Sequence, residues 1–368
     1  MFVFVCAECG AGLTAPLSRV VLPVHAHQKY GNAIQLPVLM EPGTFAVEPE
    51  PWGPPWRRWE DVDPDEPAAR GIHAPILALS DGVPGAVVIA PGDVRGTVLI
   101  PEKCSGYCCG LDGADGPNLA CEACGLPVAS RIDDCSLWQA VWLAPDAVHR
   151  RRADGIDAAP LSWTELVARE KGTPPFEPIT AWGGPRLGSY HWWSWSPRWE
   201  AAAGRALTHL LAASDGRSVT VPDGLTGEVF QRALDILLPA GPPTRRAVLA
   251  GPGLPAPDAD ADILIVPNHP QTGETWAPPG PAASTSPVPL PFGMWWWLAF
   301  PEPHPPAPVS GVLPDGVLRD DPPAPHPGSL FRPDPEIFRH TLARLPAVRS
   351  RWLHEILRTS RKAHARLF

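Results

Sequence analysis

Four cysteines in two copies of a C-x-x-C-G pattern are the residues of this chain best suited to metal chemistry. The patterns consist of Cys6, Cys9 and Gly10 and, much later, of Cys121, Cys124 and Gly125. Two cysteines three positions apart can direct both sulfurs at one ion where the chain turns sharply, and four thiolates form a standard tetrahedral set for zinc. The glycine accepts a positive φ at the end of such a turn. We therefore expect one structural zinc ion that joins the two segments.

The two patterns resemble the knuckles of zinc-ribbon and rubredoxin-type modules. The resemblance covers about ten residues, 6–10 and 121–125, and it implies a zinc-ribbon-like module with a long insertion between its cysteine pairs. The alternative is that one pair is incidental or redox-active. A thioredoxin-like pair would stand between a strand and a helix, whereas the glycines in Gly10-Ala11-Gly12 make a poor helix start.

The remaining cysteines leave a second metal site open as a hypothesis. They are Cys104, Cys108, Cys109 and Cys135. Their spacing is irregular, which weakens the prediction of a site, and another alternative is that Cys108 or Cys109 binds with the second knuckle in place of the first. His25 and His27 alternate like residues of a strand, which would put both rings on one face, as a metal pair or as two solvated side chains.

Sequence motifs that would identify an enzyme are missing. The chain has no nucleophile elbow, no His-Glu-x-x-His and no zinc-deaminase pattern, and Gly251-Pro252-Gly253 does not continue as a phosphate loop. His269 follows an apolar run that predicts a buried strand, and sites in α/β proteins often lie just beyond such strands. The candidates for a catalytic site are Asp133, Asp134, Cys135, His191 and His269.

The composition predicts folded domains joined by proline-rich connectors. The 368 residues include 51 prolines and 33 glycines, but 44% are apolar and 16 are tryptophan, which is enough for substantial cores. Arginine far outnumbers lysine, as is typical of a GC-rich bacterial genome. We expect an α+β fold. The predicted parts are a β-rich four-cysteine zinc domain over 1–150, a helix and Trp-rich connector over 151–198, a small α/β domain over 199–300, a Pro-rich linker over 301–330 and a basic helical tail over 331–368.

The charge is uneven along the chain. The net charge is −9, while residues 331–368 hold nine Arg and Lys against three acids, so the tail is +6 and the remainder −15. An acidic body argues against broad nucleic-acid binding, although the tail alone suits an anionic partner, including the acidic body itself. No basic region precedes the first apolar run and no apolar run approaches membrane-spanning length. We therefore expect a cytoplasmic protein with no membrane partner.

Local patterns predict most of the elements. Strands are expected over 2–5, 19–24, 34–40, 44–47, 137–143 and, as a short strand, 219–221. A hairpin is expected over 85–100, and buried strands over 246–250, 263–266 and 295–300. Loops are expected over 48–70 and 173–198, and a proline-rich spacer over 277–290. Ser162 and Glu165 form a capping box, Ser196-Pro197 starts a helix, Thr226 caps another, and Asp334-Pro335-Glu336 starts the first of two C-terminal helices.

Three classes of function remain open. The first is a zinc-stabilised interaction or scaffold protein with an unknown protein partner, because a closed four-cysteine site has no open coordination position for catalysis. The second is a nucleic-acid-associated protein that uses the zinc module and the basic residues 331–368. The third is an enzyme with a site near Asp133, Asp134 and Cys135 or near His269.

Overall fold

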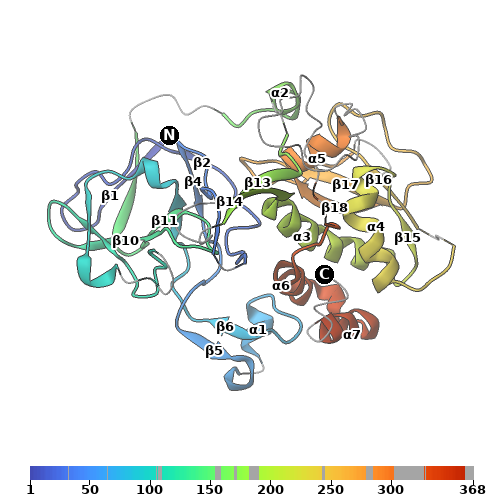
Figure 1. Ribbon diagram of the computed structural model, residues 1–368, viewed down its shortest axis with the longest axis horizontal. Coiled ribbons are helices and arrows are strands. Elements are labelled where there is room, and N and C mark those ends of the chain that lie inside the picture. Colours follow the sequence, from blue (N-terminus) through green and yellow to red (C-terminus); the bar gives the residue numbers. More distant parts are fainter. Residues whose placement is uncertain are drawn as a thin grey trace.

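The computed structural model describes most of the chain. The described residues are 1–31, 33–63, 65–104, 106, 110–153, 159–169, 172–181, 190–242, 245–278, 285–301, 327 and 329–360, with the backbone alone for 178–181 and 190–193. The fold is α+β, as predicted, with antiparallel, mixed and parallel sheets. Figure 1 shows two halves, a β-rich half (residues 1–153) and an α/β half (residues 159–360). The domain boundaries proposed above stay a prediction.

A seven-stranded sheet forms the centre of the β-rich half. Its strands in spatial order are β2 (Ser18–Arg19), β4 (Thr44–Val47), β7 (Val87–Ile89), β11 (Ala140–Leu143), β10 (Pro127–Ile132), β9 (Leu119–Cys121) and β8 (Thr97–Leu99). Side chains alternate between two buried cores: Phe45 and Ile89 face one, whereas Ala46 and Val88 face the other. The central strands are therefore buried on both faces, which explains their continuous apolar runs.

The hairpin predicted over residues 85–100 does not form. β7 pairs with β4 and β11 in the centre of the sheet, while β8 pairs with β9 at its edge. Between β7 and β8, Pro91–Asp93 make a 3-10 turn, η2, that carries the chain away from its first strand. Burial explains the separation, because Val88 and Ile89 are fully buried whereas Val98 and Leu99 are about half exposed.

Two stretches predicted as loops contain regular structure. Within 48–70 lie β5 (Trp56–Arg58), η1 (Trp59–Asp61) and α1 (Glu66–Ala69), and β5 pairs with β6 (Ala78–Ser80). Arg57 holds this small lobe together through Asp81 and Glu66. Within 173–198, β13 (Phe176–Ala181) and β14 (Tyr190–Trp195) pair with each other, and β13 also pairs with β3 (Ile34–Gln35) of the β-rich half. Strand pairing over long distances, which local patterns do not report, overrides the turn residues here.

The first ladder of the chain links its beginning to the end of the β-rich half. β1 (Phe2–Cys6) pairs antiparallel with β12 (Val148–Arg152), a strand that the local patterns did not predict. The strands expected over 19–24 and 34–40 shrink to the two-residue β2 and β3, and residues 24–27 form turns instead.

A parallel sheet organises the α/β half, as the alternation of helices and apolar runs predicts. Its order is β15 (Val219–Thr220), β16 (Arg245–Leu249), β17 (Ile263–Asn268) and β18 (Ser286–Pro291). β18 lies in a stretch predicted as a proline-rich spacer. Pro287, Pro289 and Pro291 alternate along it, so their missing N–H groups fall on one side, and Val288 and Leu290 are buried. An edge strand tolerates this pattern, because its outer side needs no donors.

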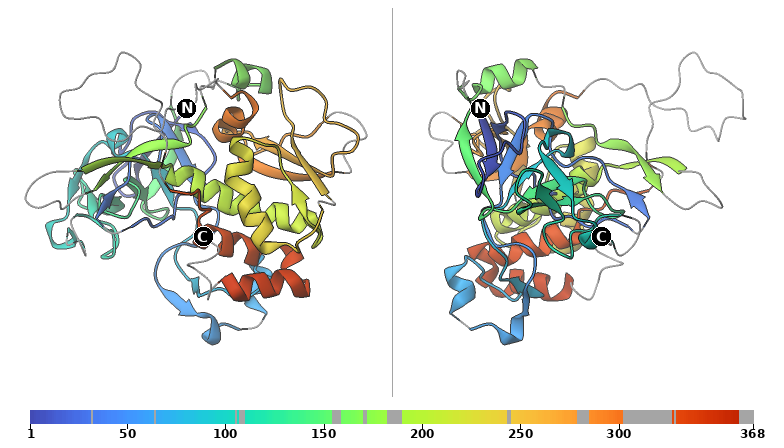
Figure 2. Two further views of the ribbon diagram at one scale, coloured as in Figure 1. Left: turned by 45° about the vertical axis from the view of Figure 1, so that its right-hand side comes forward. Right: turned by 90° about the vertical axis from the view of Figure 1, so that its left-hand side faces the viewer.

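Helices cover this sheet and connect it to the other half. They are α2 (Trp163–Arg169), α3 (Pro197–Ser214), α4 (Leu225–Leu237), α5 (Phe292–Ala299), α6 (Pro335–Arg344) and α7 (Arg351–Ser360). The Ser162–Glu165 capping box is confirmed by reciprocal hydrogen bonds, whereas Gly224, not Thr226, precedes α4. Both views in Figure 2 place α6 and α7 beside the β5–β6 lobe. There the His73 backbone N–H donates to Ala343 at 2.8 Å.

The prediction of a strand over residues 295–300 is wrong, because most of these residues belong to the helix α5. Trp295 is fully buried and its Nε1 donates to the carbonyl of Ala250, while Trp296 and Trp297 are partly buried. A short run that is apolar at every position has no periodicity that separates a buried strand from a buried helix. The preceding β18 already occupies the adjacent place in the sheet.

Candidate metal centre

The first knuckle is a tight turn at the end of β1. The backbone N–H of Gly10 donates to the carbonyl of Cys6 at 3.0 Å, and the N–H of Cys6 donates to Ala11 at 2.8 Å. Gly10 has a φ of +75°, a conformation that favours glycine. The turn returns the chain beside β1, so that Cys6 and Cys9 both stand at its tip.

The second knuckle repeats this hydrogen-bond pattern. The N–H of Gly125 donates to Cys121 at 2.8 Å, the N–H of Cys121 donates to Leu126 at 2.8 Å, and Gly125 has a φ of +80°. Cys121 ends β9, and the chain returns as β10. The same five-residue pattern therefore builds the same turn twice, each time at the end of a strand.

The segment before β8 connects the two knuckles. The N–H of Arg95 donates to Leu13, just after the first knuckle, and the carbonyl of Gly96 accepts from Glu122 inside the second, at 2.8 and 2.9 Å. Ala7 is fixed separately, because its N–H donates to the carbonyl of Ala147 at 3.0 Å. Backbone hydrogen bonds thus hold the knuckles opposite each other without using the sulfurs.

The sulfur spacing fits a tetrahedral metal ion. The four Sγ atoms of Cys6, Cys9, Cys121 and Cys124 all lie within 4.8 Å of one another. The Cys6–Cys124 and Cys9–Cys121 Sγ pairs are both 3.6 Å apart. Zn–S bonds of about 2.3 Å in a tetrahedron place the sulfurs about 3.8 Å apart, whereas a disulfide would require about 2 Å. The site therefore has the size of a metal–thiolate centre.

Burial and charge differ among the four thiols. Cys6 and Cys121 are buried, while Cys9 and Cys124 are exposed. Desolvation opposes ionisation of Cys6, but the backbone N–H groups of Cys9 and Glu8 and the neighbouring sulfurs outweigh it and lower its pKa to about 7. The N–H of Leu126 lowers the pKa of Cys124, but desolvation and the other three sulfurs raise it to about 12. Four thiolates in this space repel one another, and a cation at their centre relieves the repulsion.

The other cysteines do not assemble into a comparable group within the described residues. The four cysteines above are the single group there with three or more potential metal-ligand side chains within reach of one ion. Cys104 donates its thiol hydrogen to the carbonyl of Ile100, and Cys135 is buried. Cys108 and Cys109 lie outside the described residues, so the second metal stays a hypothesis.

His25 and His27 do not form a pair on one face. The ring of His25 packs on Trp138 with centroids 4.4 Å apart, and burial together with Arg198 lowers its pKa to about 3. The ring of His27 stacks on Trp52 at 3.8 Å, and its Nε2 contacts the carboxylate of Glu48. Residues 24–27 form a turn in place of the predicted strand, and the two rings pack against different tryptophans.

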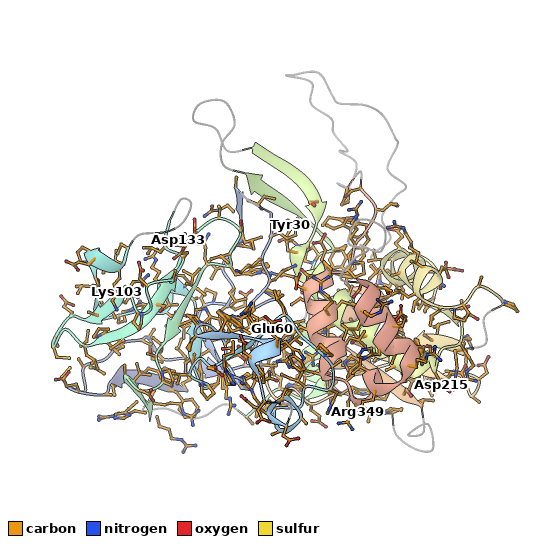
Figure 3. All side chains as sticks on the ribbon, turned by 90° about the horizontal axis from the view of Figure 1, so that it is seen from below. Tyr30, Glu60, Lys103, Asp133, Asp215 and Arg349 are labelled. Atoms are coloured by element: carbon orange, nitrogen blue, oxygen red, sulfur yellow. The ribbon has the colours of Figure 1, made fainter. Side chains whose placement is uncertain are left out.

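The candidate catalytic residues occupy different surroundings. His269 is buried, its Nε2 contacts the carbonyl of Leu161 at 2.8 Å, and its Nδ1 accepts from the N–H groups of Gln271 and Thr272. Both ring nitrogens therefore hold the loop after β17 in place. Asp133 pairs with Arg131. Figure 3 shows Asp133 on the β-rich half. Asp134 is buried and accepts from the N–H of Cys135. The side chain of His191 lies outside the described residues.

Most arginines described in the C-terminal tail contact groups within the chain. The contacts are Arg339 with Glu336, Arg344 with Glu50, Arg349 with His73, and Arg358 with Glu355. Lys and Arg beyond residue 360 lie outside the described residues. Arg344 and Arg349 thus link the tail to the β-rich half, whereas the other two contacts lie within single helices. Nucleic-acid binding through 331–368 stays a hypothesis.

A cleft between the two halves was missed by the sequence reasoning. Arg205 and His209 of α3 and His340 and Arg344 of α6 line it, together with residues 19–24. These positions come from segments far apart in the chain, so no spacing rule connects them. One signal was present, because Arg205 and His209 interrupt the otherwise Ala- and Leu-rich sequence of α3.

Comparison with known proteins adds no functional assignment. Within the described residues, no helix has the length and apolar character to cross a membrane. The chain matches no protein-family model, and comparisons with curated proteins and with solved structures give no significant similarity.

Proposed function

We propose that the protein is a zinc-stabilised interaction protein in which the four cysteines hold one structural Zn²⁺. The observation that supports this is the pair of matching knuckles with their sulfurs at the spacing of a tetrahedral thiolate site. Zinc, when bound, contributes four strong bonds and no redox chemistry. Four protein ligands fill its coordination, so a substrate would find no open position.

The interaction role is supported by the edge of the large sheet. β8 is the outermost strand, and within the described residues its outer side pairs with no other strand. Val98 and Leu99 are 47% and 48% exposed there. An edge strand with apolar side chains can accept a strand of another protein. β8 also pairs with β9, whose last residue is Cys121. The proposed zinc therefore stiffens the strand next to the docking edge.

Metal content measured by native mass spectrometry tests the centre. Wild type should carry one zinc per chain, Cys121→Ser none, and Cys104→Ser one, because Cys104 lies outside the cluster. Iron in place of zinc would disprove the zinc assignment while keeping the site. A folded wild type without any metal would disprove the centre altogether.

Affinity capture with matched variants tests the interaction role. A partner held by β8 should bind wild type and Leu77→Lys but not the double variant Val98→Lys/Leu99→Lys. Leu77 is a fair control because it is 88% exposed and lies outside the large sheet. Equal capture by all three proteins would contradict docking at β8.

A further inference from the structure

The cleft between the two halves has the size of a small-molecule site. Its volume is about 770 Å³, within the range of ligand pockets in proteins. One wall comes from the β-rich half, through residues 19–24, Glu48 and Trp52. The opposite wall comes from the α/β half, through α3, α6 and the loop 271–273 that follows the carboxyl end of β17. Parallel sheets often bind ligands at this end of their strands.

Arg205 is the group in the cleft that most needs a partner. It lies on α3 next to the fully buried Ala206 and Leu207, and burial lowers the pKa of its guanidinium. Among the described residues, no carboxylate forms an ion pair with it. A partly buried guanidinium stays charged, and leaving it without a counter-charge is costly.

The acids of the cleft already have partners. Glu50 accepts from Arg344 at 2.8 and 3.1 Å, and Glu48 contacts His27. Among the residues that the structure describes, neither acid forms an ion pair with Arg205. Arg19 at the rim adds a second cation without an ion pair in the described part of the chain. The electrostatics of the cleft accordingly favour an anion.

Two histidines near this charge are neutral at neutral pH. Burial and Arg205 lower the pKa of His209 to about 4, and burial and Arg344 lower that of His340 to about 4. His209 lies one helical turn after Arg205, so the two side chains share a face of α3. A neutral imidazole can donate one hydrogen bond and accept another, which suits an oxyanion or a hydroxyl beside it.

Trp52 provides a flat apolar surface in the same cleft. Its ring stacks on His27 and meets His340 edge-on with centroids 5.9 Å apart, and 39% of the residue is exposed. Val47 and Ile337 add aliphatic surface to the lining. The cleft thus combines the partly buried cation Arg205 with an aromatic wall.

We propose that this cleft binds a small organic anion, whose carboxylate or phosphoryl oxygens pair with Arg205 and whose planar or apolar body packs against Trp52. The loop 271–273 and α6 enclose the ligand between the two halves. Carboxylate and phosphoryl compounds share the chemistry that Arg205 recognises, and their relative affinities distinguish them. This inference does not depend on the zinc centre.

Ligand-observed NMR and calorimetry with three probes test the proposal on the full chain. The probes are benzoate, phenyl phosphate and uncharged benzyl alcohol. At least one anion should bind wild type and Arg232→Gln, a control on the exposed face of α4, and benzyl alcohol should not. Arg205→Gln should bind that anion at least about tenfold more weakly, because it loses a charge-assisted hydrogen bond. The preferred anion identifies the ligand class.

A second variant keeps the proposal falsifiable if Arg205→Gln does not fold. Trp52→Ala removes the aromatic wall from an exposed loop and should weaken the same anion about tenfold as well. Failure of both anions to bind folded wild type overturns the proposal. Unchanged affinity in the folded variants overturns it too, because it would place the anion elsewhere on the protein.

Discussion

The Sγ atoms of Cys6 and Cys124 lie 3.6 Å apart although 118 positions separate the two residues in the chain. A metal ion bound between them would close a loop that contains β2, β4, β7, β8 and β9 of the large sheet. Closing a long loop reduces the conformational freedom of the unfolded chain. We therefore expect a bound metal to stabilise the β-rich half as a whole and not the two knuckles alone.

Removing the metal should destabilise the β-rich half first. We expect a strong zinc chelator or Cys121→Ser to cost about 4 kcal/mol, because loss of a structural metal is among the most damaging single changes. Hydrogen exchange should show lost protection in β9 and β10 while β17 stays protected. Cys104→Ser is the matched control and should exchange like wild type. Loss of protection that is uniform over the whole chain, or no loss at all, would contradict a stabilising effect of the metal on the β-rich half.

The knuckle glycines should differ from Gly96 in their cost of substitution. A Cβ at Gly10 or Gly125 meets nothing within 4 Å, so Gly10→Ala and Gly125→Ala should cost about 1–2 kcal/mol of left-handed strain alone. A Cβ at Gly96 would stand 2.6 Å from the carbonyl oxygen of Gly12, with φ at +55°. Gly96→Ala should therefore cost clearly more. Urea unfolding measures all three, and equal costs would contradict the close approach at Gly96.

The contribution of Glu200 to stability should fall as the pH rises. Burial, helped by nearby Asp334, raises its pKa from an ordinary value of 4.5 to about 8. Between these values the folded chain holds a proton that the unfolded chain has released, so this stabilising contribution is full below pH 4.5 and lost above about pH 8. Tyr30, from the β-rich half, hydrogen-bonds the Glu200 carboxylate, and Figure 3 shows Tyr30 between the halves.

Glu200→Gln tests this pH dependence. The amide keeps hydrogen-bonding capacity and cannot ionise, so the variant should lose less stability than wild type between pH 5 and 8. Denaturant unfolding at several pH values measures the difference. Exposed Glu102→Gln should follow the wild-type curve. A Glu200→Gln curve parallel to wild type would mean that Glu200 is ionised in the folded protein.

The contact between Gly251 and Trp295 predicts a costly overpacking. A Cβ at Gly251 would stand 2.1 Å from the ring of Trp295, which is fully buried and hydrogen-bonded to Ala250. Gly251→Ala should cost about 2–3 kcal/mol, because the ring has no free space to move into. Gly92→Ala is the control, since a Cβ there meets nothing within 4 Å. Thermal unfolding should separate the two variants clearly.

Features set by residues close together in the chain were predictable. The knuckle turns, the capping box at Ser162 and the start of α6 at Asp334 all depend on hydrogen bonds within about five positions. The buried strand near Ile263 followed from its apolar run. In each case the interacting residues are close together in the sequence, so a local pattern is sufficient to predict the structure they form.

Features set by distant partners needed the tertiary structure. The apolar run at 295–300 was compatible with a strand or a helix. It forms a helix because the preceding β18 already occupies the adjacent place in the sheet. The sequences of β7 and β8 were compatible with a hairpin, but in the sheet β7 pairs with β4 and β11, and β8 pairs with β9. The anion cleft joins α3, α6 and residues 19–24, which no spacing relates. The cysteine pattern predicted which four cysteines come together. Only the folded sheet decided that their sulfurs meet at the spacing of a metal site, because backbone pairing across the chain positions them.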